Sequence, residues 1–228
     1  MIQFESVTKK YPNGQIALDD VNLKIEDGEF VFVTGLSGAG KSTLLKLITR
    51  ETRPSVGKVL IDEQDILKIP EGKLPILRRR IGTIFQDFKL LLNRTVFENV
   101  AVPLEVLSQK DSHIEKEVSA TLEKVGLLEK ANNFPAQLSG GEIQRTAIAR
   151  AIVAKPVVLL ADEPTGDLDP KTAREVVELL EKINKEDKTT IIMATHNEAV
   201  VNHFKKRVIV LKKGKIEKDT KEGTYEAD

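Results

Sequence analysis

The residues best suited to carry chemistry form a glycine-rich run at residues 35–42. The run reads Gly-Leu-Ser-Gly-Ala-Gly-Lys-Ser, with an apolar β-prone stretch before it and apolar residues at helical spacing after it. Glycines let the backbone turn closely and aim several N–H groups inward, and a helix start adds the positive end of its dipole. Such a loop can cradle phosphate, with Lys41 directed at the β- and γ-phosphates of a nucleotide and Ser42 at Mg²⁺. The alternative is a plain glycine turn between a strand and a helix.

The candidate phosphate-binding residues share this loop and the first turn after it. They are Gly35, Ser37, Gly38, Ala39, Gly40, Lys41, Ser42 and Thr43. Tyr11, in the turn-forming cluster 11–14, could supply a ring on which a purine stacks. Its alternative role is that of a turn aromatic packed against a sheet.

Two neighbouring carboxylates, Asp162 and Glu163, directly follow the apolar run 157–161. Carboxylates at the end of a buried strand are costly unless they hold a cation or a polarised water. The carboxyl edge of an open α/β sheet is also where ligands bind. We predict that Asp162 holds Mg²⁺, usually through water, and that Glu163 is the general base for an attacking water. The alternative is a solvated strand end before a turn at Pro164.

Gln86 and His196 end two further apolar runs and are expected at the same edge of the sheet. The Gln86 amide could bind the metal ion or its water, and His196 could donate a hydrogen bond to the transferring group or its water. The alternative for His196 is a structural role, which is the more common one for a lone histidine. For Gln86, position alone does not distinguish a functional role from a structural one.

A second candidate anion site lies at residues 138–142, before another predicted helix. Ser139 and Glu142 fit a Ser-x-x-Glu capping box, which is the structural interpretation. The same Ser139, the amides of Gly140 and Gly141 and the helix dipole could also bind phosphate. Because the chain already has one phosphate cradle, a second one suggests that the other phosphate is held by a second chain.

The bulk composition restricts the classes of function. Thirty-five acidic residues balance thirty-five basic ones among 228 residues, so no overall field attracts nucleic acid, and no nucleic-acid partner is expected. The absence of cysteine excludes disulfides, thiolate zinc sites and thiol catalysis. No apolar run approaches the roughly 20 residues that span a bilayer, and the start does not resemble a signal peptide. We expect a soluble, cytoplasmic protein unless a partner carries it to a membrane.

The elements that must position these residues follow two hydrophobic patterns. Alternating residues at 2–7 and 21–25 predict half-exposed antiparallel strands. Uninterrupted apolar runs predict central strands covered on both faces. These runs are 30–34, 81–85, 157–161, 190–194 and 208–211.

Helical signals dominate the middle of the chain. Residues 111–125 carry apolar residues at three- and four-residue spacing, and 141–153 predicts a second helix. We predict a single domain over 1–228, in which 87–154 is a helical subdomain inserted between core segments 1–86 and 155–228. The helix after the glycine loop is expected to end near residues 53–54, and the polar tail from Asp219 is expected to fray.

Taken in chain order, these residues resemble the motifs of the nucleotide-binding subunits of ATP-binding-cassette (ABC) transporters, over essentially the whole chain. The Walker A, signature and Walker B motifs match residues 35–42, 138–142 and Asp162 with Glu163. The adenine-stacking aromatic, Q-loop glutamine, D-loop aspartate and switch histidine match Tyr11, Gln86, Asp169 and His196.

The resemblance implies a fold and a cofactor. The fold is an α/β P-loop NTPase of the ABC ATPase type, with a RecA-like core, an antiparallel β-subdomain and an inserted α-helical subdomain. The cofactors are ATP and Mg²⁺, the latter held by Ser42, Gln86 and Asp162.

The resemblance also implies a mechanism in which two chains sandwich two ATP molecules head to tail. Ser139, Gly140, Gly141 and Glu142 form the signature that meets the γ-phosphate held by the other chain. Hydrolysis through Glu163 and His196 opens the sandwich. A groove near Gln86 receives a helix from an integral membrane partner, which places the chain at the inner face of the cell membrane.

Within the family, residues 79–91 and 94–101 resemble the ATPases of bacterial cell-division complexes, whose output is control of peptidoglycan hydrolases. Two departures from that subgroup are Leu36, where proline is common, and Asp167, where asparagine is common. One alternative is the ATPase of a lipoprotein-release or macrolide-type exporter. Another is a soluble clamp-like cassette protein, although such proteins usually carry two cassettes or long insertions.

Overall fold

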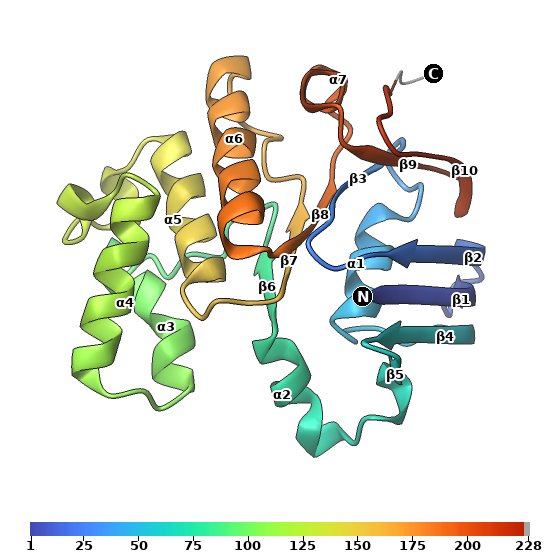
Figure 1. Cartoon of the computed structure of the whole chain (residues 1–228), viewed down its shortest axis with the longest axis horizontal. Helices are drawn as coiled ribbons and strands as arrows, with labels where there is room; N and C mark the ends of the chain where they lie inside the picture. The colour runs from blue at the N-terminus through green and yellow to red at the C-terminus, as the bar shows by residue number, and fades with distance from the viewer. Residues whose placement is uncertain (226–228) are drawn as a thin grey trace.

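The computed structural model describes residues 1–225, which form two sheets with helices between and around them (Figure 1). The smaller sheet is antiparallel, in the order β2 (Ile16–Ile25), β1 (Ile2–Lys10), β4 (Val56–Ile61), β5 (Gln64–Asp65). The larger sheet has the order β10 (Lys215–Thr220), β9 (Arg207–Lys212), β3 (Phe30–Thr34), β8 (Thr190–Ala194), β7 (Val158–Asp162), β6 (Ile81–Ile84). All neighbouring strands of this sheet pair in parallel, except that β10 pairs antiparallel with β9.

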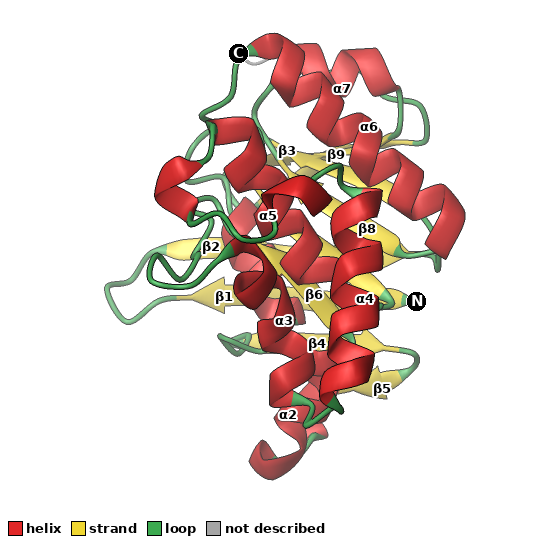
Figure 2. Cartoon of the chain, turned by 90° about the vertical axis from the view of Figure 1, so that its left-hand side faces the viewer, coloured by secondary structure: helices red, strands yellow, loops and turns green. Residues whose placement is uncertain are grey.

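The helices divide between the two faces of the larger sheet. The helix α1 (Lys41–Ile48) lies between the sheets, and α2 (Leu74–Arg79) leads into β6. Between β6 and β7 the chain forms α3 (Val96–Val106), α4 (Asp111–Lys124) and α5 (Gly140–Ile152), which lie in front of the larger sheet in Figure 2. The remaining helices are α6 (Pro170–Asp187) and α7 (Glu198–Phe204).

The strand β3 shows why central strands lack polar alternation. Phe30 and Phe32 pack into a core with the helices α3 to α6, whereas Val31 and Val33 pack into a second core with α1 and the smaller sheet. All five residues of β3 are buried. Both faces of the larger sheet are therefore covered, and the end of β3 leads directly into the glycine-rich loop.

The predicted elements of the middle segment are confirmed. In α4, the buried residues are Ile114, Val118 and Leu122, which are the apolar positions that the spacing indicated. The helix α5 begins one residue before its predicted start, with Ser139 as its N-cap. Because burial of one apolar face stabilises such helices, their sequence periodicity was sufficient to locate them.

The helix after the glycine-rich loop is shorter than predicted. It ends at Ile48, and Arg50 adopts a positive φ of 52° that cannot continue an α-helix. The Arg50 side chain is buried and donates hydrogen bonds to the carbonyls of Ile66 and Ile69. This long-range contact stabilises the end of the helix and has no local sequence signal.

The prediction that the tail frays from Asp219 is wrong for residues 219–225, and residues 226–228 lie outside the part that the structure describes. The strand β10 pairs with β9 as far as Thr220, and Arg207 forms an ion pair with Asp219 at 2.7 Å. Tyr225 is buried, with 4% of its surface exposed. An edge strand with mostly exposed side chains shows no hydrophobic pattern, since backbone pairing and charge stabilise it.

Gly82→Ala is expected to destabilise the fold where α5 packs on β6. An added Cβ would lie 2.4 Å from the carbonyl oxygen of Ala151 and 3.0 Å from Leu159, so the end of α5 must shift. We expect the free energy of unfolding to fall by about 1–3 kcal/mol, the usual range for overpacking. Urea denaturation measures this loss. Gly72→Ala is the matched control, because its Cβ meets nothing within 4 Å, and equal stability of the two variants would contradict the prediction.

Candidate active site

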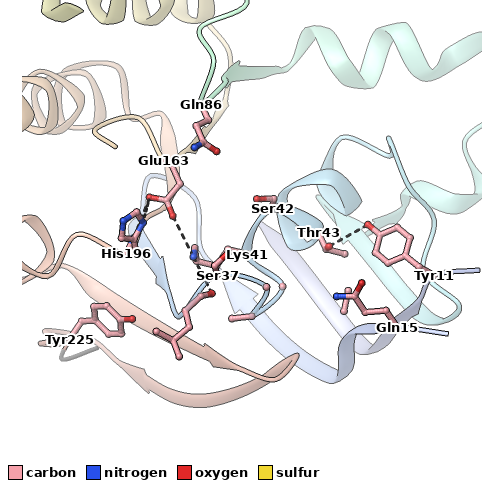
Figure 3. A pocket seen from close by; sticks show the side chains of 15 residues that line it. Tyr11, Gln15, Ser37, Lys41, Ser42, Thr43, Gln86, Glu163, His196 and Tyr225 are labelled. Carbon is pink, nitrogen blue, oxygen red and sulfur yellow. Dashed lines mark hydrogen bonds and ion pairs between the residues drawn. The ribbon is translucent and has the colours of Figure 1, made fainter. Parts of the chain in front are cut away.

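The glycine-rich loop lines a cavity of about 410 Å³ at the carboxyl edge of β3 (Figure 3). Gly35 has φ of 142°, and a Cβ there would lie 2.2 Å from the carbonyl oxygen of Leu211. Gly40, the N-cap of α1, has φ of 112°, and its Cβ would lie 2.4 Å from the carbonyl oxygen of Ala17. Only glycine fits at both positions, so the loop can lie against its neighbours while the start of α1 faces the cavity.

The Lys41 ammonium lies at the centre of this loop. It is 8% exposed and donates hydrogen bonds to the carbonyl oxygens of Gly35 at 2.7 Å and Leu36 at 3.4 Å. Its Nζ is also 3.4 Å from Glu163 Oε1. A buried ammonium at the first residue of a helix that opens on a cavity is suited to binding an anion of high charge density.

Glu163 connects Lys41 to His196. Its Oε2 lies 3.0 Å from His196 Nδ1, and it accepts a hydrogen bond from the backbone N–H of His196 at 3.3 Å. The Glu163 backbone has φ of 49°, a strained conformation for a side chain of this size, and its N–H donates to the carbonyl of Ala194 at 2.9 Å. The carboxylate is thus aimed into the cavity, where it can accept a proton from a water molecule.

The residues predicted to hold a metal ion lie beside Lys41. The Ser42 hydroxyl donates to Asp162 Oδ1 at 3.0 Å, and Gln86 points into the same cavity from the segment after β6. Burial raises the pKa of Asp162, with the neighbouring Glu163 charge acting in the same direction. A desolvated carboxylate in contact with a hydroxyl, at the edge of a cavity that an amide side chain also lines, fits Mg²⁺, which prefers oxygen ligands and retains waters. Among residues 1–225, no cluster of three histidine, cysteine or acidic residues suggests a different metal.

Tyr11 lies at the opposite end of the cavity, where a base would extend from the loop. Its hydroxyl is 3.3 Å from Thr43 Oγ1, and the Lys9 ammonium lies 5.0 Å from the ring centroid. Gln15 lines the cavity next to it. The ring is partly exposed and lines the cavity, where a base could stack on it.

The signature residues do not line this cavity. Ser139 and Glu142 form a capping box, in which the Ser139 N–H donates to Glu142 Oε2 at 2.8 Å. This bond lowers the pKa of Glu142. Asp169 likewise caps α6 and accepts hydrogen bonds from the N–H groups of Lys171 and Thr172. The structural interpretation of the capping box is therefore confirmed, and within one chain the signature lies outside the pocket.

Three residues that line the cavity were missed by the sequence analysis. They are Gln15, Ala17 and Tyr225. Gln15 and Ala17 lie next to the predicted turn but carry no chemical signal. Tyr225 lies in the polar tail, and its only hint was that the chain has just one other tyrosine.

A family model and several known proteins match this chain. The model described as ABC transporter matches residues 18–166. The chain is 52% identical to the cell division ATP-binding protein FtsE of Bacillus subtilis, over 99% of this chain and 98% of that protein. It is 50% identical to FtsE of Escherichia coli K12, over 95% of this chain and 97% of that protein. Among solved structures, the chain is similar to the ATP-binding cassette MJ0796 in its dimeric, post-hydrolysis state bound to ADP and Pi. The TM-score is 0.88 and the identity 39%, over 99% of this chain and 100% of that chain.

The match to the solved cassette extends over the whole fold, including the helices between β6 and β7. The model match covers more than half of the chain, and the relatives match it almost from end to end. We therefore assign the α/β fold to the ABC ATPase type. The chain belongs to the ABC transporter family.

Proposed function

We propose that this chain is the ATP-hydrolysing subunit of a membrane complex that acts in bacterial cell division. Its partner would be an integral membrane protein resembling FtsX, and its output the regulation of peptidoglycan hydrolases. The observation that carries the enzymatic part is the contact of Glu163 with both Lys41 and His196 beside the phosphate loop. The cell-division part rests on the FtsE relatives, which are about half identical over nearly their full length.

The geometry supports a direct route for hydrolysis. The N–H groups of residues 35–40 and the start of α1 bind the phosphates of ATP, and Lys41 exchanges its carbonyl partners for phosphate oxygens. Glu163 accepts the proton of the attacking water, while His196 orients Glu163 and the transferring group. Mg²⁺, held by Ser42, Asp162 and Gln86, would neutralise charge on the phosphates.

We infer that two copies of the chain complete each other's sites in the ATP-bound state. The Ser139–Glu142 segment is partly exposed at the N-terminus of α5 and lies outside its own cavity. Gly140 and Gly141 pack against Leu168 and Thr172, so this end of α5 is supported by the D-loop region. A helix N-terminus with free amides can bind the γ-phosphate on a partner chain. The similar cassette MJ0796 is dimeric with ADP and Pi bound.

The helical segment 87–154 is proposed as the subdomain that meets the membrane partner. A hollow of about 440 Å³ lies where β6, the end of α3 and the end of α5 meet. It is lined by apolar residues, among them Phe85, Val106 and Leu107, and by Arg78, Arg79 and Arg150. This composition fits an amphipathic helix with acidic residues. No helix within residues 1–225 has the length and apolar character to cross a bilayer, so we propose peripheral binding at the cytoplasmic face of the membrane through this partner.

Affinity purification of the full chain from detergent-solubilised cells tests this function. We expect an integral membrane protein resembling FtsX to be recovered with the unchanged chain. Val106→Glu should abolish recovery, since this residue is 66% exposed in the hollow and a carboxylate there breaks the apolar surface. Val56→Glu is the matched control, because Val56 is 63% exposed on the smaller sheet, outside the hollow.

The same experiment separates the alternative function. Recovery of a lipoprotein-release or macrolide-type permease in place of the FtsX-like protein would overturn the cell-division role and favour an exporter. Depletion of the chain gives an independent readout. Filamentous or unseparated cells support the proposal, and lost export with normal division contradicts it.

A further inference from the structure

The tail residue Tyr225 occupies a position that neither its sequence context nor the proposed mechanism explains. The chain has two tyrosines, and both line the nucleotide cavity. Tyr225 lies on the opposite side of the phosphate loop from Tyr11, near His196, and its hydroxyl points toward the loop (Figure 3). It is only 4% exposed, although it is three residues from Asp228, the last residue of the printed sequence.

A short strap, residues 221–225, holds this ring in place. The Gly223 N–H donates to the carbonyl of Lys206 at 3.1 Å, and a Cβ on Gly223 would lie 2.7 Å from Val208 Cβ, so the strap crosses β9 closely. The Tyr225 N–H donates to Asn202 Oδ1 at 2.7 Å, and Asn202 Nδ2 donates back to the Tyr225 carbonyl at 3.0 Å. Asn202 lies on α7, the helix that follows His196. The strap is therefore fastened both to the sheet and to the element after the switch histidine.

The ring lies beside the tip of the phosphate loop. Tyr225 lines the nucleotide cavity and also a second hollow of about 210 Å³, and Leu36, Ser37 and Gly38 line both. The ring and the tip of the loop thus border the same two hollows.

The tip of the loop is held by hydrogen bonds within the loop itself, which the Leu36 carbonyl accepts from the Ala39 N–H at 3.1 Å and from Lys41 Nζ at 3.4 Å, but its outer side is open. Leu36 is 54% exposed, and a Cβ on Gly38, which has φ of 79°, would meet nothing within 4 Å. The far end of the loop, in contrast, is held by a hydrogen bond from the Gly214 N–H to the Ala39 carbonyl. In the proposed mechanism the N–H groups of residues 35–40 bind the phosphates, so displacement of the tip would weaken those hydrogen bonds.

We propose that Tyr225 is a positioning residue for nucleotide binding: the strap fastens its ring beside the tip of the phosphate loop and so sets the direction of the loop amides. This inference rests on the proposed nucleotide-binding function. The ring acts through the loop and not on the reacting atoms, so its loss changes affinity for ATP and ADP alike and leaves the chemical step at saturation unchanged.

Titration of the full chain with ADP carrying an N-methylanthraniloyl fluorophore tests the proposal. Tyr225→Ala should raise the dissociation constant about tenfold, as expected when binding groups are displaced by a fraction of an ångström. The number of sites and the kcat for ATP should stay unchanged. Tyr225→Phe, which keeps the ring, should restore the affinity. Thr224→Ala is the matched control, because its side chain is exposed in the same strap.

The outcomes distinguish positioning from folding. An unchanged dissociation constant in Tyr225→Ala, or fewer sites at unchanged affinity, would overturn the proposal. If Tyr225→Ala does not fold, Asn202→Ala tests the proposal in its place, because it removes the hydrogen bonds that hold the strap and keeps the ring. A raised dissociation constant in that variant supports the proposal, and an unchanged one overturns it. Lys41→Ala, measured alongside, tests nucleotide binding itself, so failure of the strap and failure of the proposed function are separable.

The tyrosine fluorescence of the chain gives a second readout. The protein has no tryptophan, so Tyr11→Phe leaves Tyr225 as its only tyrosine. Saturating ADP should change the emission of Tyr225 in this variant, since its hydroxyl points toward the loop that binds the phosphates. Emission that does not respond to bound ADP would place the ring away from the site and overturn the proposal.

Discussion

Glu163→Gln is expected to lower ATP turnover by at least about a hundredfold, the usual contribution of a general base. The amide has the size of the carboxylate but cannot accept a proton from water. It also removes the negative charge that lies 3.4 Å from Lys41 and 3.0 Å from His196. Release of inorganic phosphate from ATP measures the effect. Glu115→Gln is the matched control, because Glu115 is exposed on α4.

Binding of ATP should survive in Glu163→Gln, so the ATP-bound dimer should accumulate. Size-exclusion chromatography with ATP and Mg²⁺ would then show a stable dimer. The unchanged chain should instead elute, once its ATP is hydrolysed, as it does without ATP. Hydrolysis at the unchanged rate would remove Glu163 from the role of base. Lost ATP binding together with lost turnover would instead assign Glu163 to the binding of nucleotide.

Lys41→Ala is expected to weaken ATP binding by about 10- to 100-fold, because a hydrogen bond to a charged group contributes about 1.5–3 kcal/mol. The Lys41 ammonium is buried in the loop and lies among the groups that face the cavity. Equilibrium binding of a fluorescent ATP analogue measures the loss. Lys116→Ala removes an exposed lysine from α4 and serves as control. Affinity that matches the control would show that the loop is not the phosphate cradle.

The two substitutions should separate binding from chemistry. Glu163→Gln retains affinity and loses turnover, whereas Lys41→Ala loses affinity first, because Lys41 is expected to contact phosphate in both ground and transition states. If both variants lose only turnover, the contact between Glu163 and Lys41 would be catalytic alone. This result would contradict the division of roles proposed for the site.

Local sequence patterns were sufficient for most of the fold. The uninterrupted apolar run of β3 and the helical spacing of α4 indicated these elements because burial of side chains stabilises both. The glycine pattern of the phosphate loop was equally informative, since the positive φ of Gly35 and Gly40 excludes other residues. The apolar patterns and the glycine spacing are local features of the sequence, although the carbonyls that exclude a Cβ at Gly35 and Gly40 belong to the distant residues Leu211 and Ala17.

Other features depend on contacts between distant segments. The helix α1 ends at Ile48, and Arg50 donates hydrogen bonds to the carbonyls of residues 66 and 69 just after this end. No helix-stop residue near Ile48 predicts where the helix ends. The tail is ordered through Tyr225 because Asn202 and β9 receive it. The sequence of the tail is polar with one aromatic residue, so no hydrophobic pattern predicted its contacts with Asn202 and β9.

The candidate site itself combines both kinds of information. The sequence was sufficient to propose which residues carry the chemistry, because Lys41, Glu163 and His196 each follow a buried strand or loop with a recognisable pattern. The contacts of Glu163 with Lys41 and with His196 follow from the order of the strands in the folded sheet. The strands β3, β8 and β7 are neighbours in one parallel sheet, so residues far apart in the chain meet at its carboxyl edge. Strand order arises from packing of the whole sheet, and no local pattern encodes it.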